Sequence, residues 1–534
     1  MTDVIGGWSG TVAPSFGRSE IARAAHRFRE RAMVVIDPST GRYGVALGGK
    51  LGPTDAPGTW PVVGALAPMY PEWLGDRSFN EMHGTRFPYA SGDMANGIAT
   101  SRLVIEMGKG GFLGFFGAAG LTIDRIETAI DEIGQALGPT GAPFGFNLIH
   151  SPHEPALEAA AADLYLRRGV RKVSAAAFMA LTPPIVRYAY SGIHLDASGV
   201  VQRPNAVFAK ISRPEVARHF MNPAPVAMLD RLVADGQLSI DEARLAANLP
   251  VAEDFTIESD SGGHTDNRPL APLFSAIQAV RDEVVAEQRY DRPIRLGAAG
   301  GIGTPQAVAA AFALGASYVL TGSINQACVE SGLSDEGKRM LALADIADVT
   351  MAPAADMFEL GVELQVLKRG TMFAPRAKKL GELYRTYPSI DAIPVDEIRN
   401  LETRIIGMTV SECWTATRTF WMGRDAAQIA RAESDPRHKM ALMFRSYLGL
   451  SSRWSIDGVA DRHMDYQIWC GPAMGAFNAW VAGSFLAQPE NRTVAQVAKN
   501  LMEGAASVTR AQQLRTYGVA VPSEAFDFRP RLLQ

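Results

Sequence analysis

The strongest constraint on the fold is a pattern that recurs between residues 87 and 320, in which a short apolar stretch is followed by a helical one. The predicted strands are Phe87–Ala90, Phe112–Phe116, Phe144–Ile149, Lys172–Ala177, Ala206–Ile211, Phe255–Glu258, Ile294–Ala298 and Tyr318–Leu320. Strands that alternate with helices indicate parallel strand–helix–strand units. Eight such units close a (β/α)8 barrel, and we predict this α/β fold. A Rossmann sheet would need a GxGxxG motif after an early strand, which the N-terminal third lacks.

The barrel leaves residues over at both ends, and we predict three domains: a small unit at 1–60, the barrel at 61–375 and a helical domain at 376–534. The helical patterns of the last domain lie at Pro394–Met408, Val410–Met422, Ala426–Ala432, His438–Leu448 and Thr493–Ala506. Five of the eight tryptophans fall there, which indicates a core of its own or a large docking surface.

Smaller features are predicted inside these domains. The first unit is expected to hold a basic helix, Ser19–Arg31, and a β-hairpin that ends in a Gly- and Pro-rich linker, Gly48–Gly58. The two strands of the hairpin are Met33–Ile36 and Tyr43–Leu47. Near 222–250 the barrel is predicted to have an insertion of two helices. Ser239 and Asp241 are suited to cap the second of them. The segment Phe358–Gly370 mixes apolar and charged residues like a helix that packs on the barrel.

Two glycine-rich turns follow the last two predicted strands. Gly300, Gly301 and Gly303 lead into Thr304-Pro305, a helix-start signature, and Gly322-Ser323 follows the eighth strand. Glycines at a helix start let backbone N–H groups approach an anion, and the loops after strands 7 and 8 are the usual phosphate site of such barrels. A tight structural turn could have the same residues, but two such turns, one strand apart, favour a ligand that carries a phosphate.

A second set of candidate residues follows the other strands. His264 comes after Gly262-Gly263, which would allow close approach to a flat ligand, and a rim histidine suits general acid–base chemistry. Gly92, Asp93 and Met94 form a small-residue loop after strand 1, where Met94 could pack on a ring. Asn147 is a polar residue in an apolar strand, and Lys210 ends strand 5, where it could hold an anion. Each of these residues could also have a purely structural role. His264 could be an ordinary polar-loop histidine, and Gly92–Met94 an ordinary loop. Asn147 could be a structural amide, and Lys210 a lysine that extends to solvent.

Composition excludes several classes of function. A formal charge of −4 and a pI near 6.2 give no argument for nucleic acid or an anionic membrane as partner. The sequence contains no run of 18 apolar residues, so no membrane span is predicted. The first residues lack a signal-peptide pattern. The three cysteines are scattered, which fits a reducing cytoplasm. His150 and His153 have no third ligand placed to join them, so we expect no metal.

Taken together, the motifs resemble the PfaD family, the trans-acting enoyl reductases of polyunsaturated fatty acid and trans-acyltransferase polyketide synthases, within the nitronate monooxygenase-like FMN barrels. The resemblance covers nearly the whole chain and is carried by residues 88–121, PFGFNLIHSP (143–152), ESDSGGHTDNRP (258–269), LGAAGGIGTPQA (296–307), VLTGSINQA (319–327), FELGVELQVLKRGTMF (358–373) and YQIWCGPAMGAFNAW (466–480). The segments after residue 350 point to the reductase branch. One departure stands out: nitronate enzymes usually carry Gly-Pro-Met after strand 1, and this chain carries Asp93 in place of the proline.

The resemblance implies an FMN whose phosphate is held by the Gly300–Gly303 turn and Gly322-Ser323. The flavin ring would lie near Gly92, Asp93, Met94, Asn147, Lys210, Gly262 and Gly263. It also implies that NADPH reduces the flavin, that the β-carbon of a 2-enoyl thioester receives the hydride, and that His264 transfers the proton. The substrate would arrive on acyl carrier domains of another chain, and a homodimer is possible. The alternatives are a nitronate monooxygenase-type flavin oxidase and a flavin-binding docking subunit.

Overall fold

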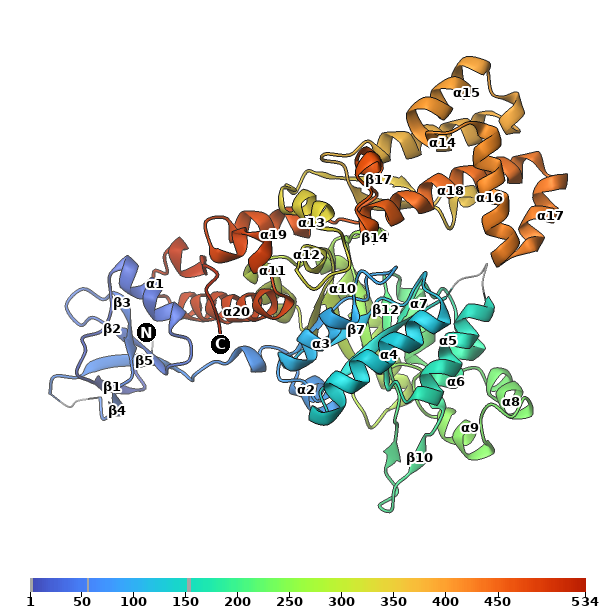
Figure 1. Cartoon of the computed structure of the whole chain (residues 1–534). Coiled ribbons are helices and arrows are strands. Elements are labelled where there is room, and N and C mark those ends of the chain that lie inside the picture. Colours follow the sequence, from blue (N-terminus) through green and yellow to red (C-terminus); the bar gives the residue numbers. More distant parts are fainter. Residues whose placement is uncertain (1–2, 55–56, 151–154) are drawn as a thin grey trace.

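The computed structural model describes residues 3–54, 57–150 and 155–534. Its centre is a closed barrel of parallel strands in the order β12-β13-β15-β16-β6-β7-β8-β9 (Figure 1). The strands are β6 (Tyr89–Ser91), β7 (Leu113–Phe116), β8 (Phe144–Ile149), β9 (Lys172–Ala176), β12 (Ala206–Ile211), β13 (Asp254–Glu258), β15 (Arg295–Ala299) and β16 (Tyr318–Thr321). All eight predicted strands are confirmed, with ends that differ by at most two residues.

Helices follow the strands and cover the outside of the barrel. They are α3 (Ser101–Lys109), α4 (Ile123–Leu137), α5 (Pro155–Arg168), α6 (Pro183–Tyr190), α7 (Pro214–Met221), α10 (Leu270–Gln288), α11 (Pro305–Ala313), α12 (Ser323–Gln326) and α13 (Asp335–Ala342). In contrast, α2 (Arg77–His83) precedes the first barrel strand, and its Phe79 and His83 pack against Phe208 inside the barrel. Thr304 caps α11 as predicted, because its side chain accepts a hydrogen bond from the Ala307 N–H. Val308 and Ala311 of α11 are fully buried.

The predicted insertion is confirmed as two helices, α8 (Val226–Ala234) and α9 (Ile240–Ala246). Ser239 is the N-cap of α9 and forms a capping box with Glu242, while Asp241 lies in the first turn instead of capping the helix. A short hairpin that the sequence did not reveal, β10 (His194–Leu195) with β11 (Val201–Gln202), extends from the same side of the barrel (Figure 1).

The N-terminal residues form an antiparallel sheet with the order β3-β2-β5-β1-β4. The strands are β1 (Gly6–Ser9), β2 (Ala32–Ile36), β3 (Tyr43–Leu47), β4 (Lys50–Gly52) and β5 (Trp60–Leu66), and helix α1 (Arg18–His26) lies between β1 and β2 in the chain. The predicted hairpin is confirmed as β2 and β3. The linker prediction is wrong for Lys50–Gly52, because these residues pair with β1 as an edge strand. The sheet also continues beyond residue 60, since β5 pairs with both β1 and β2.

A second small sheet lies above the barrel and joins β14 (Gly263–His264), β18 (Glu363–Leu367) and β17 (Val349–Pro353). The predicted helix at Phe358–Gly370 is therefore wrong: one 3-10 turn, η3 (Phe358–Leu360), precedes strand β18. The alternation of Leu364, Val366 and the polar residues between them has the period of a strand, and β18 buries most of its length between two partner strands.

The C-terminal helices divide between two cores. A lobe at the upper right of Figure 1 holds α14 (Phe373–Thr386), α15 (Val395–Leu401), α16 (Val410–Arg424), α17 (Ala426–Ser434) and α18 (Pro436–Asp457). The π-helical turn η5 (Glu402–Ile406) follows α15, and η6 (Ala460–Asp465) follows α18 and packs on it as part of the same lobe. In contrast, α19 (Ala473–Val481) and α20 (Val494–Thr516) pack with the barrel. Gly504 of α20 lies against Pro305, and Leu514 packs with Ile21 of α1, so α20 joins the barrel to the N-terminal sheet.

Every helical pattern predicted after residue 376 is confirmed as a helix, while α14 and α19 were missed. The residues grouped as one domain from 376 to 534 are shared between the lobe and the barrel. Among the described residues, no helix combines the length and the apolar composition needed to cross a membrane.

Candidate functional site

The carboxyl ends of the barrel strands bring the predicted site residues to one face. Gly92–Met94 follow β6, Asn147 lies within β8 and Lys210 within β12, and the loop from Glu258 to His264 follows β13. The two glycine turns follow β15 and β16. This face is where barrels of this type bind their ligands.

A buried polar network fills the mouth of the barrel. The Asn147 side-chain amide donates to the Asp93 carboxylate and, at 3.3 Å, to the Ser174 carbonyl. Lys210 Nζ lies 3.3 Å from Asp93 Oδ1 and 3.7 Å from Glu258 Oε1. Asp93 is almost fully buried, and Lys210 compensates its charge. The sequence thus predicted three members of this network, Asp93, Asn147 and Lys210, which the structure brings into contact.

The charges in this network shift the pKa values of its members. Burial would lower the pKa of Lys210, but the Asp93 and Glu258 carboxylates outweigh it and hold the pKa above its ordinary value. Burial raises the pKa of Glu258, and the Asp93 charge adds to this effect while Lys210 opposes it. Lys210 is therefore a fixed cation, and Glu258 is a carboxyl group that holds its proton more readily than usual.

His264 lies on the rim, on strand β14, with its side chain 47% exposed. Its Nε2 is 3.1 Å from Oδ1 of Asp356, a residue of the loop between β17 and β18. Burial lowers the pKa of His264, but the hydrogen bond and charge of Asp356 outweigh burial, so the pKa lies above its usual value. The charges of Glu258 and Lys210 also act on His264, in opposite directions. A histidine with a raised pKa is suited to donate a proton.

Strand β18 and the segment after the lobe hold the loop that carries His264. Gln365 donates 2.7 Å hydrogen bonds to the Asp260 carboxylate and to the Ser261 carbonyl. A Cβ added at Gly262 would lie 2.7 Å from the backbone N of Cys470, so the close approach at Gly262 is to the chain itself. Gly263 needs its glycine for a different reason, since its φ of +82° is left-handed.

The glycines of the two turns also divide by what they face. A Cβ at Gly300 would meet the Ser259 backbone at 2.7 Å, and one at Gly303 would meet the Ala473 carbonyl at 2.3 Å. By contrast, a Cβ at Gly301 or Gly322 would meet nothing within 4 Å. The two glycines that face open space belong to neighbouring loops, as expected for a shared ligand.

The backbone donors of the first turn are also free. Within the part of the chain that the structure describes, no hydrogen bond engages the N–H groups of Gly301, Ile302 and Gly303. Ile302 and Gly303 are buried, and buried N–H groups nearly always have a partner. The turn leads into α11, whose N-terminal end favours negative charge. These residues fit a phosphate group.

The mouth of the barrel fits the polar edge of a ring in the same way. The side-chain oxygen of Asn147 is buried and has no hydrogen-bond partner, and the same holds for the Ser174 hydroxyl. The half-buried Met94 and the buried Gly92 lie beside them in the loop after β6. The donor set therefore suits the FMN that the motifs predicted: a phosphate at the turns, and a ring that satisfies Asn147.

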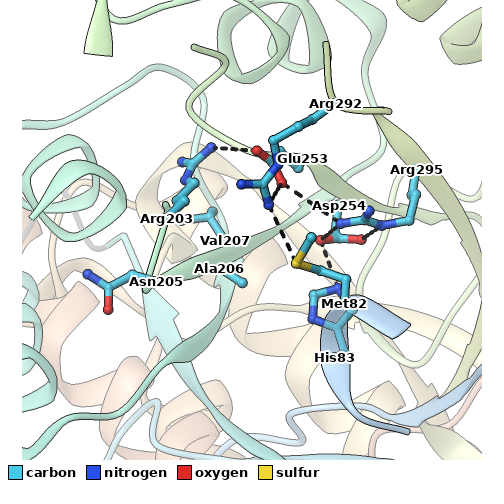
Figure 2. Close-up of a pocket in the computed structure, with 10 residues that line it drawn as sticks. All are labelled: Met82, His83, Arg203, Asn205, Ala206, Val207, Glu253, Asp254, Arg292 and Arg295. Carbon is cyan, nitrogen blue, oxygen red and sulfur yellow. Dashed lines mark hydrogen bonds and ion pairs between the residues drawn. The ribbon is translucent and has the colours of Figure 1, made fainter. Parts of the chain in front are cut away.

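The opposite end of the barrel holds a hollow that the site does not use (Figure 2). It is lined by Met82, His83, Arg203, Asn205, Ala206, Val207, Glu253, Asp254, Arg292 and Arg295. The last of these, Arg295, pairs with Asp254 at 2.6 and 2.8 Å, and His83 lies 3.0 Å from the same carboxylate. Because Asp254 and Arg295 begin their strands, this cluster closes the barrel floor, where residues usually serve stability.

Among the described residues, no group of His, Cys, Asp and Glu could hold a metal ion. His150 pairs with Glu158 at 2.7 Å, and His153 lies outside the described residues.

Sequence reasoning missed three residues of the site: Glu258, Asp356 and Gln365. Glu258 ends its strand and could have been found by the signal that identified Lys210. The pairing of Asp356 with His264 spans 92 residues and has no local signature.

Comparisons with known proteins agree with this fold. The sequence pattern of the nitronate monooxygenase family matches residues 77–372, and that of the inserted helical domain of [acyl-carrier-protein] S-malonyltransferase matches residues 387–466. The enoyl reductase domain of MlnA, from the macrolactin biosynthesis cluster of Bacillus amyloliquefaciens, superimposes with a TM-score of 0.80. It is 36% identical and aligns over 83% of this chain and 99% of its own length.

Two curated relatives are longer proteins. A polyunsaturated fatty acid synthase subunit of Thraustochytrium sp. (strain ATCC 26185 / S-3) is 46% identical over 83% of this chain and 30% of its own length. Polyketide biosynthesis protein PksE of Bacillus subtilis (strain 168) is 42% identical over 81% of this chain and 56% of its own length. The chain thus spans less than two thirds of either relative.

Proposed function

Since the chain belongs to the nitronate monooxygenase family, in the PfaD branch of enoyl reductases that its motifs predicted, we propose that it is a flavin-dependent enoyl reductase acting in trans. Its substrates are 2-enoyl thioesters on the acyl carrier domains of a polyunsaturated fatty acid or polyketide synthase. The observation that carries the proposal is the similarity, over almost the whole of that domain, to the MlnA enoyl reductase.

The residues of the mouth have separate tasks in this proposal. A bound FMN would supply the hydride chemistry, with NADPH as the source of electrons and the β-carbon of the enoyl thioester as their acceptor. Asn147 binds the edge of the ring with its unpartnered oxygen, and Asp93 and Lys210 hold Asn147 in place. His264 donates the proton that the α-carbon receives, and Asp356 orients its ring.

The arrangement around Asp93 weakens the case for nitronate oxidation. Asp93 stands where nitronate enzymes usually carry proline, and its carboxylate is tied to Lys210 and Asn147. A charged, hydrogen-bonded side chain in this loop changes both the shape and the polarity of the mouth. The docking subunit is the less favoured alternative, because unpartnered buried donors at Ile302 and Gly303 indicate a site built to bind a ligand.

Anaerobic spectroscopy tests the proposal. NADPH should bleach the flavin absorbance of the purified protein, and a crotonyl thioester should restore it. In a His264→Ala variant, the flavin should still bind and bleach, while re-oxidation by the thioester slows about 100-fold or more. Turnover of a nitroalkane with oxygen, and none of the thioester, would contradict the proposal. Re-oxidation at the parent rate in His264→Ala would assign proton donation to another group, with Glu258, whose carboxyl pKa burial raises, as a candidate.

A further inference from the structure

Three loops of the ligand face meet one segment from outside the barrel, Trp469–Ala473, which we call the clasp. Gly262 of the His264 loop lies against the backbone of Cys470, and Gly303 of the first glycine turn lies against the Ala473 carbonyl. From the connection that follows β16, Gln326 of α12 donates to the Trp469 carbonyl. The clasp connects η6 of the lobe to α19, so a segment outside the eight strand–helix units completes the ligand face.

One contact of the clasp involves Ser323, a residue predicted to bind the phosphate. The Gly471 N–H donates a hydrogen bond of 3.1 Å to the Ser323 hydroxyl oxygen. A hydroxyl has one proton, and with its oxygen accepting from Gly471 the proton must be directed elsewhere. Among the described residues, no acceptor takes it. Ser323 follows Gly322, whose missing side chain faces open space, so this proton is available to a ligand bound there.

The clasp is held where it is by close backbone packing. A Cβ added at Gly471 would lie 2.9 Å from the Gly262 N and 3.0 Å from the Ser261 carbon. The opposing groups are backbone atoms, which cannot move aside as a flexible side chain would. The contact between Gly262 and Gly471 therefore sets the position of the Gly471 N–H relative to Ser323.

From these contacts we infer that the clasp is part of the cofactor's phosphate subsite, with Gly471 as a positioning residue that turns the Ser323 hydroxyl into a donor to the phosphate. This rests on the proposed function, since it deepens the flavin site. The subsite combines the free N–H groups of Gly301, Ile302 and Gly303 with the Ser323 hydroxyl, a donor set for a phosphate monoester. Binding of the phosphate and docking of the clasp are thermodynamically linked, so each stabilises the other.

The experiment compares FMN with riboflavin, which differs from it only in the phosphate. Apoprotein freed of flavin is titrated with each by fluorescence quenching. Ser323→Ala should weaken FMN binding about ten-fold and leave riboflavin binding unchanged. Gly471→Ala should lower the ratio of FMN to riboflavin affinity by a similar factor, and the double variant should lose no more than either single one. Gly423→Ala, on an open helical surface of α16, is the matched control and should not change the ratio.

Hydrogen exchange on the parent protein tests the same idea without a substitution. The peptide that contains Gly471 should exchange more slowly with FMN bound than with riboflavin bound. A ratio that Ser323→Ala lowers but Gly471→Ala does not, or equal exchange with the two flavins, would overturn the role of the clasp. Failure to bind either flavin would instead overturn the proposed function, so the two failures are distinguishable.

Discussion

The pairing of His264 with Asp356 makes a prediction with a defined size. Replacing Asp356 with asparagine removes the negative charge that lies 3.1 Å from His264 Nε2 but retains the shape of the side chain. Both side chains are about half exposed, at 47% and 58%, so water screens their attraction. An exposed pair contributes about 0.2–1 kcal/mol. Loss of this contribution should lower the pKa of His264 in Asp356→Asn, because the carboxylate attracts only the protonated ring.

The change in the His264 pKa should also change the pH dependence of activity. His264 donates a proton only when it is protonated, so enoyl reduction should decline as the pH rises through its pKa. Because Asp356 raises that pKa, the charged form persists to higher pH in the parent. In Asp356→Asn the alkaline limb of the pH profile should move to lower pH, in the same direction as the His264 pKa. For stability, the pair contributes fully below the ordinary histidine pKa and is lost as the pH rises through the raised one.

Nuclear magnetic resonance of ring-labelled histidine measures this pKa directly. The chain has nine histidines, and a His264→Gln variant identifies the resonance. Asp230→Asn, an exposed change on α8, is the control and should leave the titration in place. Added salt should narrow the difference between parent and Asp356→Asn, since the pair is screened. An unchanged or raised pKa in Asp356→Asn would refute the argument that Asp356 poises His264.

Two further predictions concern the ends of the barrel. Gly301→Asp places a carboxylate beside the free N–H groups of the turn, so the purified variant should keep its fold and lose its flavin; retained flavin absorbance would show that the turn is only structural. Asp254→Asn breaks the buried contact with Arg295 and should cost about 3–5 kcal/mol in urea unfolding at pH 7. His83 and Arg295 hold the pKa of Asp254 low against burial, so the parent should lose this stability as the pH falls, while the variant should show a flatter pH dependence.

The sequence predicted those parts of the fold whose signal is local. Each barrel strand is a short apolar run between turn residues, and Thr304-Pro305 marks the start of α11, so both could be placed from neighbouring residues alone. Phe358–Gly370 was assigned wrongly because its strand β18 belongs to a sheet assembled from three distant segments. Charged residues at both ends of this segment resemble the polar face of an amphipathic helix. The pairing with β14 and β17 is what makes the segment a strand.

The candidate site shows the same limit. Asp93, Asn147 and Lys210 each stand out in their own strand or loop, and the closed barrel then brings them together. Asp356 and Gly471 carry no such mark, because their partners lie 92 and 148 residues away. A residue whose role is to position another is recognisable only when the contact between them is known.

The glycines show why a motif can be found correctly and still be interpreted incompletely. Removing a Cβ allows close approach, but the sequence does not say what approaches. At Gly301 and Gly322 there is open space for a ligand, whereas at Gly262 and Gly303 the chain's own clasp fills it. The two glycine motifs, Gly262–His264 and Gly300–Gly303, therefore serve both the ligand and the clasp. It follows that substitutions at Gly262 should disturb the clasp first, and FMN through it, while those at Gly301 should disturb the phosphate directly. Hydrogen exchange at Gly471 in the two variants separates these effects.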